Sequence, residues 1–84
     1  MALSERIVQV VDRQFAPSQR DAALTALVAW QAPNDRIRLA ALRLGDGDLA
    51  KLSSAIDLAK VDWRDLLVAA GFADDVQAHH RWMP

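Results

Sequence analysis

The sequence predicts an all-α protein, a compact bundle of about five short helices forming a single domain over residues 1–84. Three observations support this prediction. Apolar residues recur three or four positions apart along most of the chain, which is the spacing of one helix face. Proline, glycine, asparagine and aspartate interrupt that pattern at intervals, as they do at helix boundaries. No segment alternates apolar and polar residues for the length of a strand.

The first two helices are predicted on either side of Pro17. Ser4 can cap the first helix, and the Ala16–Pro17 step ends it because proline cannot continue a helix. Ser18 is the expected N-cap of a second helix over residues 19–32, which is apolar over a wide arc and therefore expected at the centre of the bundle. The apolar stripe of the first helix consists of Ile7, Val8, Val11 and Phe15.

Two further helices are predicted around a glycine-rich turn. Asn34 is the expected cap of a third helix, which ends at Gly45 because glycine readily takes the left-handed conformation after a helix. Asp46 or Asp48 is expected to cap the fourth. The inward residues are predicted to be Ile37, Ala40, Ala41 and Leu44 on the third helix, and Leu49, Leu52, Ile56 and Ala59 on the fourth.

Asp62 is expected to cap a fifth helix that ends at Gly71. Residues 73–82 follow as a short sixth turn or helix, or as part of a loosely ordered tail over 73–84. Trp30 and Trp63 lie in apolar stripes and are expected in the core.

Composition excludes several classes of protein. There is no cysteine, so the chain has neither a disulfide framework nor a thiolate metal site, and a cytoplasmic location is expected. The longest uncharged apolar run, residues 66–73, is far too short to span a membrane. Net charge is −1, which gives no overall attraction to nucleic acid. Residues 1–45 hold six basic and four acidic residues, whereas 46–84 hold four and seven, a split that could favour head-to-tail association.

No catalytic, cofactor-binding or metal-binding residue is predicted. The Asp46–Gly47–Asp48 turn lacks the later ligands of a calcium loop, and helix capping accounts for its carboxylates. Four residues of metal-ligand type lie near the C-terminus, but no third ligand shares the helical face of Asp75 and His79. Those four residues are Asp74, Asp75, His79 and His80.

Three arginines are the best nucleic-acid feature of the sequence. Arg36 and Arg43 are seven residues apart and share a helix face, while Arg38 points elsewhere. A small nucleic-acid-associated regulator that uses these residues is the alternative hypothesis for function. The segment that imitates a helix-turn-helix argues against it, because Asp62 and Asp65 there would repel phosphates.

The leading hypothesis is a non-enzymatic protein–protein interaction module that self-associates or binds another protein. Hydrophobic residues make up 52% of the chain, which is more than so small a bundle readily hides. Leu39 and Leu42 lie off the inward row of the third helix and are the expected interface residues. Trp82, two residues from the end, is expected either to dock onto the bundle or to join that interface.

The stretch RIRLAALRLGDGDLAKLSSAIDLAKVDWRDLLVAAGF, residues 36–72, resembles small uncharacterised bacterial proteins. Both have an arginine-flanked apolar helix, a short acidic loop before leucine, and an aspartate-aromatic-arginine-aspartate turn before a final helix. The resemblance implies an all-helical fold and a bacterial source. It implies no activity, cofactor or site residue.

Overall fold

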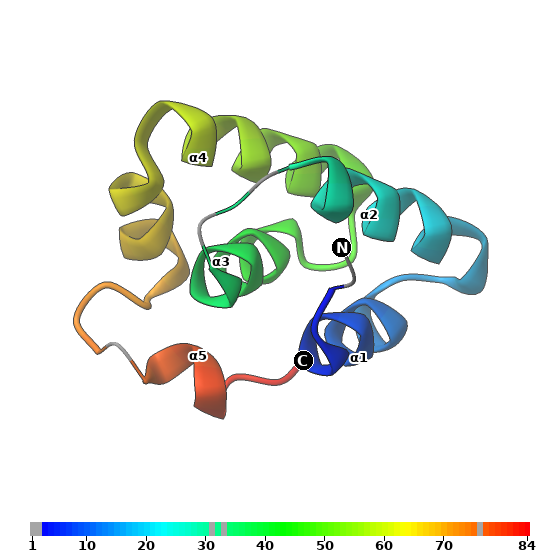
Figure 1. The fold of residues 1–84 in the computed structure, drawn as a ribbon, viewed down its shortest axis with the longest axis horizontal. Helices are drawn as coiled ribbons and strands as arrows, with labels where there is room; N and C mark the ends of the chain where they lie inside the picture. Colours follow the sequence, from blue (N-terminus) through cyan, green and yellow to red (C-terminus); the bar gives the residue numbers. More distant parts are fainter. Residues whose placement is uncertain (1–2, 31, 33, 76) are drawn as a thin grey trace.

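The computed structural model describes residues 3–30, 32, 34–75 and 77–84, and its regular structure there is helical, with no strand. Figure 1 shows α3 in the middle, α4 above it, and α1 and α5 below. The predicted all-α class is confirmed. The five helices are α1 (Glu5–Gln14), α2 (Pro17–Ala29), α3 (Asp35–Gly45), α4 (Leu49–Ala70) and α5 (Ala78–Arg81).

The central helix is α3, where every residue from Ile37 to Leu42 is buried. It contacts α1, α4 and α5, so its side chains meet protein in nearly every direction. The expectation that the second helix is central is wrong. The buried residues of α2 are Ala23 and Leu27, and Val28 on its outer side is 51% exposed.

The two N-terminal helices differ from their predicted bounds only at α2. The Ser4 hydroxyl accepts a hydrogen bond from the Ile7 amide, as expected of an N-cap. Ser18, in contrast, lies inside α2, because Pro17 occupies the first helical position, where its missing N–H costs nothing. The helix ends at Ala29, and Trp30 follows it into the core with 7% exposure.

The turn between α3 and α4 depends on two close backbone approaches. Gly45 ends α3 in helical conformation, and a Cβ there would lie 3.1 Å from the Cα of Leu52. The helix ends at Gly45 as predicted, but the residue in the left-handed conformation is the next one, Asp46, with a φ of 48°. Gly47 has a φ of +81° and packs so closely on α1 that a Cβ would lie 2.5 Å from the Gln14 carbonyl oxygen. The Asp48 carboxylate caps α4.

Asp62 divides α4 into two segments, residues 49–61 and 63–70, which Figure 1 shows as a bend. Its φ of −154° and ψ of 98° are not helical, and its carboxylate accepts a hydrogen bond from the Arg64 amide at 3.0 Å. The predicted helix start at Asp62 is confirmed by this geometry. Gly71 then ends α4 with a φ of +78°.

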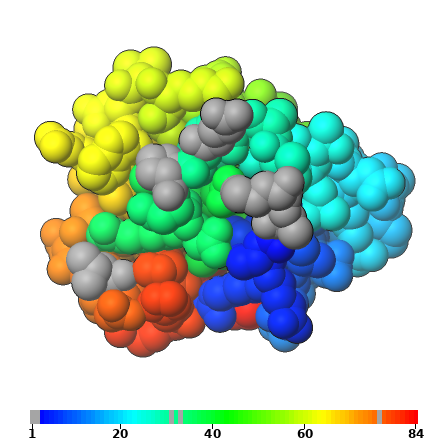
Figure 2. All heavy atoms as spheres, in the orientation of Figure 1, coloured from blue at the N-terminus to red at the C-terminus, as the bar shows by residue number. Residues whose placement is uncertain are grey.

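The C-terminal segment closes the bundle. Phe72 is fully buried, and α5 places the partly buried Trp82 against the core, with the two ring centroids 6.2 Å apart. The Arg6 guanidinium donates hydrogen bonds to the His79 and Trp82 carbonyl oxygens. Figure 2 shows the red C-terminal residues against blue α1 and green α3. Trp82 thus docks onto the bundle, which is one of its two expected placements, and α5 lies within the range predicted for a short sixth helix.

Candidate functional site

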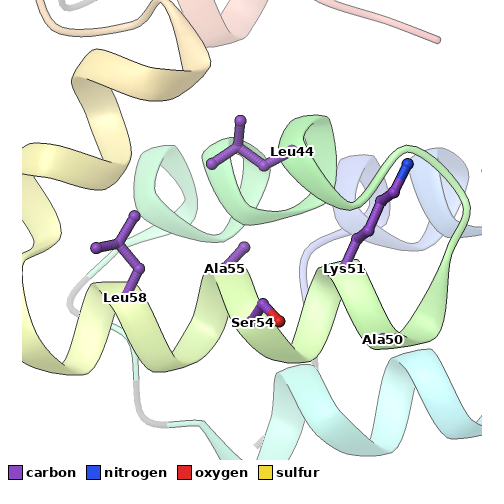
Figure 3. Close-up of a pocket in the computed structure, with 6 residues that line it drawn as sticks. All are labelled: Leu44, Ala50, Lys51, Ser54, Ala55 and Leu58. Atoms are coloured by element: carbon purple, nitrogen blue, oxygen red, sulfur yellow. The ribbon is translucent and has the colours of Figure 1, made fainter.

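A groove runs between the C-terminal end of α3 and the first segment of α4. Its volume is about 380 Å³. Leu44 on α3 and Leu58 on α4 are partly buried residues that border it. Figure 3 shows Leu44 above α4, with Leu58 and Ala55 directed toward the same side. The lining residues described by the structure are Leu44, Ala50, Lys51, Ser54, Ala55 and Leu58.

Small side chains on α4 keep the groove open. Ala50, Ser54 and Leu58 are four residues apart and form one row along the helix, and Lys51 and Ala55 form the next. Ala55 is 4% exposed and makes an apolar floor. Rows spaced in this way, with small residues between larger ones, form the kind of groove that receives the side-chain ridge of another helix.

Lys51 is the one ionisable side chain among the described lining residues of the groove. These residues include no carboxylate or histidine, so they offer no acid–base pair for proton transfer. The groove is therefore an apolar surface with a single positive charge at one end. This chemistry is suited to binding an apolar side chain next to a carboxylate.

The outer face of α2 has the opposite charge. Asp21, Leu24 and Val28 lie at positions i, i+3 and i+7, so they share one side of the helix. Val28 is 51% exposed and Leu24 is partly exposed. Together with the smaller Thr25 and Ala29, these residues line a shallow surface hollow of about 560 Å³. This face is an exposed apolar strip with a carboxylate at its N-terminal end.

The predicted interface at Leu39 and Leu42 is wrong. Leu39 is 1% exposed and Leu42 is fully buried, so neither side chain can touch a partner of the folded chain. The prediction assumed that α3 buries one face, whereas α3 is surrounded by other helices. The apolar pattern predicts Leu44 inward and does not distinguish Lys51 or Leu58 as site residues. The one sequence signal for the groove is Lys51, a lysine among the small residues of α4.

The three arginines do not form an exposed cationic face. Arg38 is 6% exposed and pairs with the Asp35 carboxylate at 3.4 Å. Arg36 and Arg43 share a side of α3 as predicted, but both lie against Phe72. The Arg36 guanidinium donates to the Phe72 carbonyl oxygen, and the Arg43 guanidinium carbon lies 5.3 Å from the Phe72 ring centroid. The contacts of Arg36 and Arg43 hold the C-terminal segment. The predicted phosphate contact is wrong for Arg38, because its side chain is buried and paired with Asp35.

The C-terminal carboxylates and histidines do not converge on a metal centre. Asp75 pairs with Arg81, whose guanidinium hydrogen bond lowers the pKa of that carboxyl. His79 is buried, its Nδ1 has no hydrogen-bond partner, and its ring centroid is 3.9 Å from that of His80. Within the described part of the chain, no group of three metal-ligand residues comes together.

Burial is the main cause that lowers the pKa of His79 below its usual value of 6.5. The positive charges of His80, Arg36 and Arg6 lower it further, and Asp35 opposes them weakly. Burial and these neighbouring charges therefore favour the neutral form of the imidazole.

A second hollow, of about 360 Å³, lies where the N-terminal end of α3 meets the second segment of α4. Its described lining is Asn34, Arg36, Ile37, Trp63 and Leu67. Ile37 and Leu67 form a buried apolar base, and Trp63 is 43% exposed. The prediction that Trp63 is a core residue is therefore wrong, because its position directly after the bend at Asp62 leaves nearly half of its surface exposed.

No helix within the described residues is long and apolar enough to cross a lipid bilayer. The chain matches no protein-family model, and neither a curated protein nor a solved structure matches it significantly.

Proposed function

We propose that this protein is a non-enzymatic protein-interaction module whose α3–α4 groove binds an amphipathic helix. The observation that carries the proposal is the groove itself, with Leu44 and Leu58 at its edges, a small-residue floor and Lys51 as its single charge. The absence of cysteine fits a module that works in the reducing cytoplasm.

A helix is the occupant that the groove fits best. The lining residues of α4 follow i, i+4 rows, and a partner helix can place apolar residues three or four positions apart between such rows. Ala50 and Ser54 have side chains short enough to let a partner backbone approach closely. The partner helix should carry a carboxylate next to its apolar residues, because Lys51 would then be paired.

The helix that we assign to the groove is α2 of a second copy of this chain. Its outer face presents Leu24 and Val28 three and seven residues after Asp21, so apolar residues and a carboxylate lie on one side. Leu24 and Val28 would enter the groove while Asp21 pairs with Lys51. The exposed half of Val28 would then leave water, which is favourable by roughly 25 cal/mol per Å² of apolar surface.

This assignment gives a head-to-tail assembly. One copy uses its groove and the other its α2 face, so each complex retains a free groove and a free α2 face. Growth beyond the dimer follows unless the rotation closes a ring. A single helix in a shallow groove buries less surface than stable interfaces do, so the association is expected to be weak.

Sedimentation equilibrium from low micromolar to millimolar concentration tests the proposal. The expected result is an average mass that rises with concentration and does not level off at the dimer unless a ring closes. Lys51→Glu and Asp21→Lys should each weaken association about fivefold, because each places like charges opposite one another. The double variant restores opposite charges and should associate like the unmodified protein.

Lys60→Glu is the matched control, since Lys60 is the other exposed lysine of α4, lies outside the groove lining and gives the same change in net charge. It should weaken association less than Lys51→Glu does. An unmodified protein that stays monomeric to millimolar concentration would overturn the assignment of α2 as the occupant. Equal effects of the two lysine variants would overturn the groove as the contact surface.

A further inference from the structure

The hollow at Trp63 has features that the interaction groove lacks. An indole is among the largest apolar side chains, and leaving 43% of it in water forfeits burial energy that a core position would supply. Here the indole borders a concave space of about 360 Å³ over the buried Ile37 and Leu67. That volume lies at the lower end of the range for small-molecule sites.

The polar side chains of this hollow are donors. One N–H of the Arg36 guanidinium donates a hydrogen bond to the Phe72 carbonyl oxygen, which fixes the direction of the side chain. The Nε of Arg36 is buried and has no hydrogen-bond partner. The Asn34 side-chain oxygen already accepts a hydrogen bond from the Ile37 amide, so its NH₂ group is the part left to bind a ligand. A ligand that satisfies these groups must supply acceptor atoms.

The electrostatic surroundings favour an anion. The hollow lies at the N-terminal end of α3, where the helix dipole is positive. The Arg64 guanidinium carbon lies 5.3 Å from the centroid of the Trp63 ring and adds a second cation. None of the described lining residues is acidic. Of the carboxylates near them in the chain, Asp35 pairs with the buried Arg38 and Asp62 accepts a hydrogen bond from the Arg64 amide, while Asp65 is exposed on α4.

We propose that this hollow binds a small planar carboxylic acid, with a single aromatic ring as its apolar part. The ring lies against Trp63 over Ile37 and Leu67. The carboxylate accepts hydrogen bonds from Arg36 and Asn34. This site is separate from the α3–α4 groove and shares none of its lining residues.

Titration of ¹⁵N-labelled protein with benzoate, followed by NMR, tests the proposal. The three tryptophan indole N–H signals give an internal comparison, because Trp30 and Trp82 do not line the hollow. We expect benzoate to shift the Trp63 indole signal and the amides of Ile37 and Leu67, with saturation in the millimolar range. Benzamide has the same shape without the charge, and it should bind about tenfold more weakly.

Arg36→Gln should weaken benzoate binding about tenfold by removing the cation. Arg43→Gln is the matched control, because Arg43 also contacts Phe72 but does not line the hollow, and it should bind benzoate normally. Trp63→Ala should weaken benzoate binding several-fold. Because Trp63 is 43% exposed, this variant tests the site without disturbing the contact between Arg36 and Phe72.

Three results would overturn the proposal. One is equal binding of benzoate and benzamide to the unmodified protein, which needs no variant to interpret. Another is an equal shift of all three indole signals, and the last is benzoate binding that Trp63→Ala leaves unchanged.

Discussion

Removing the Phe72 side chain should destabilise the whole domain. Phe72 follows the end of α4 and is fully buried, with His79, Trp82 and Arg43 around its ring. Phe72→Ala loses the transfer energy of the ring and leaves a cavity, which together cost about 3–5 kcal/mol at buried phenylalanines. An 84-residue domain has a total stability of roughly 4–13 kcal/mol, so this single change removes a large part of it.

Equilibrium unfolding in urea, followed by circular dichroism, measures this loss. Phe72→Leu keeps most of the volume and should cost about 1–1.5 kcal/mol. Val61→Ala is the control, because Val61 is 87% exposed and its truncation should change the free energy of unfolding by less than about 0.5 kcal/mol. A loss below about 1 kcal/mol for Phe72→Ala would refute the reasoning, since Phe72 would then not belong to the cooperative core.

Three further effects are expected from local features. The pKa of His79 is lowered in the folded protein, so below pH 6.5 the unfolded chain binds more protons than the folded one. The contribution of His79 to stability should therefore be constant above pH 6.5 and fall as the pH decreases below it. Urea unfolding at several pH values measures this dependence, and His79→Gln should flatten it. Gly47→Ala should destabilise the domain by more than about 1 kcal/mol, because its φ is +81° and a Cβ would clash with the Gln14 carbonyl; a thermal melt equal to that of the unmodified protein would contradict this. Asp48→Ala should lower the free energy of unfolding by about 1 kcal/mol, because the Asp48 carboxylate accepts hydrogen bonds from two amides at the start of α4. Asp57 is exposed within the same helix, so Asp57→Ala should change the free energy of unfolding little.

The helix boundaries were the most predictable part of this protein. Ser4, Asn34, Asp48 and Asp62 all accept hydrogen bonds from backbone amides two or three residues later, as their sequence positions suggest. Such a contact depends on residues within one helical turn, so the sequence contains nearly all the information needed. Ser18 is the exception: it was predicted as an N-cap, but the helix begins one residue before it, because Pro17 can itself occupy the first helical position.

The predicted interface at Leu39 and Leu42 failed for a different reason. Their spacing shows which side of α3 they occupy, but only the packing of the bundle shows that this side is also covered. The same holds for Arg38, whose charge suggested a surface position and whose side chain is buried beside Asp35. The prediction for Trp63 was wrong in the opposite direction, because this apolar residue was expected in the core and lies exposed after the bend in α4.

The all-α class and the position of nearly every turn follow from the order of the residues alone, because helix periodicity, caps and breakers act over a few residues. Which helix is central, which apolar residues remain exposed and which side chains meet depend on how the helices pack against one another. The groove brings Leu44 together with Leu58, and the second hollow brings Arg36 together with Trp63, across two helices. Contacts between residues so far apart in the chain depend on how α3 and α4 pack, and periodicity along one helix carries no information about its neighbour.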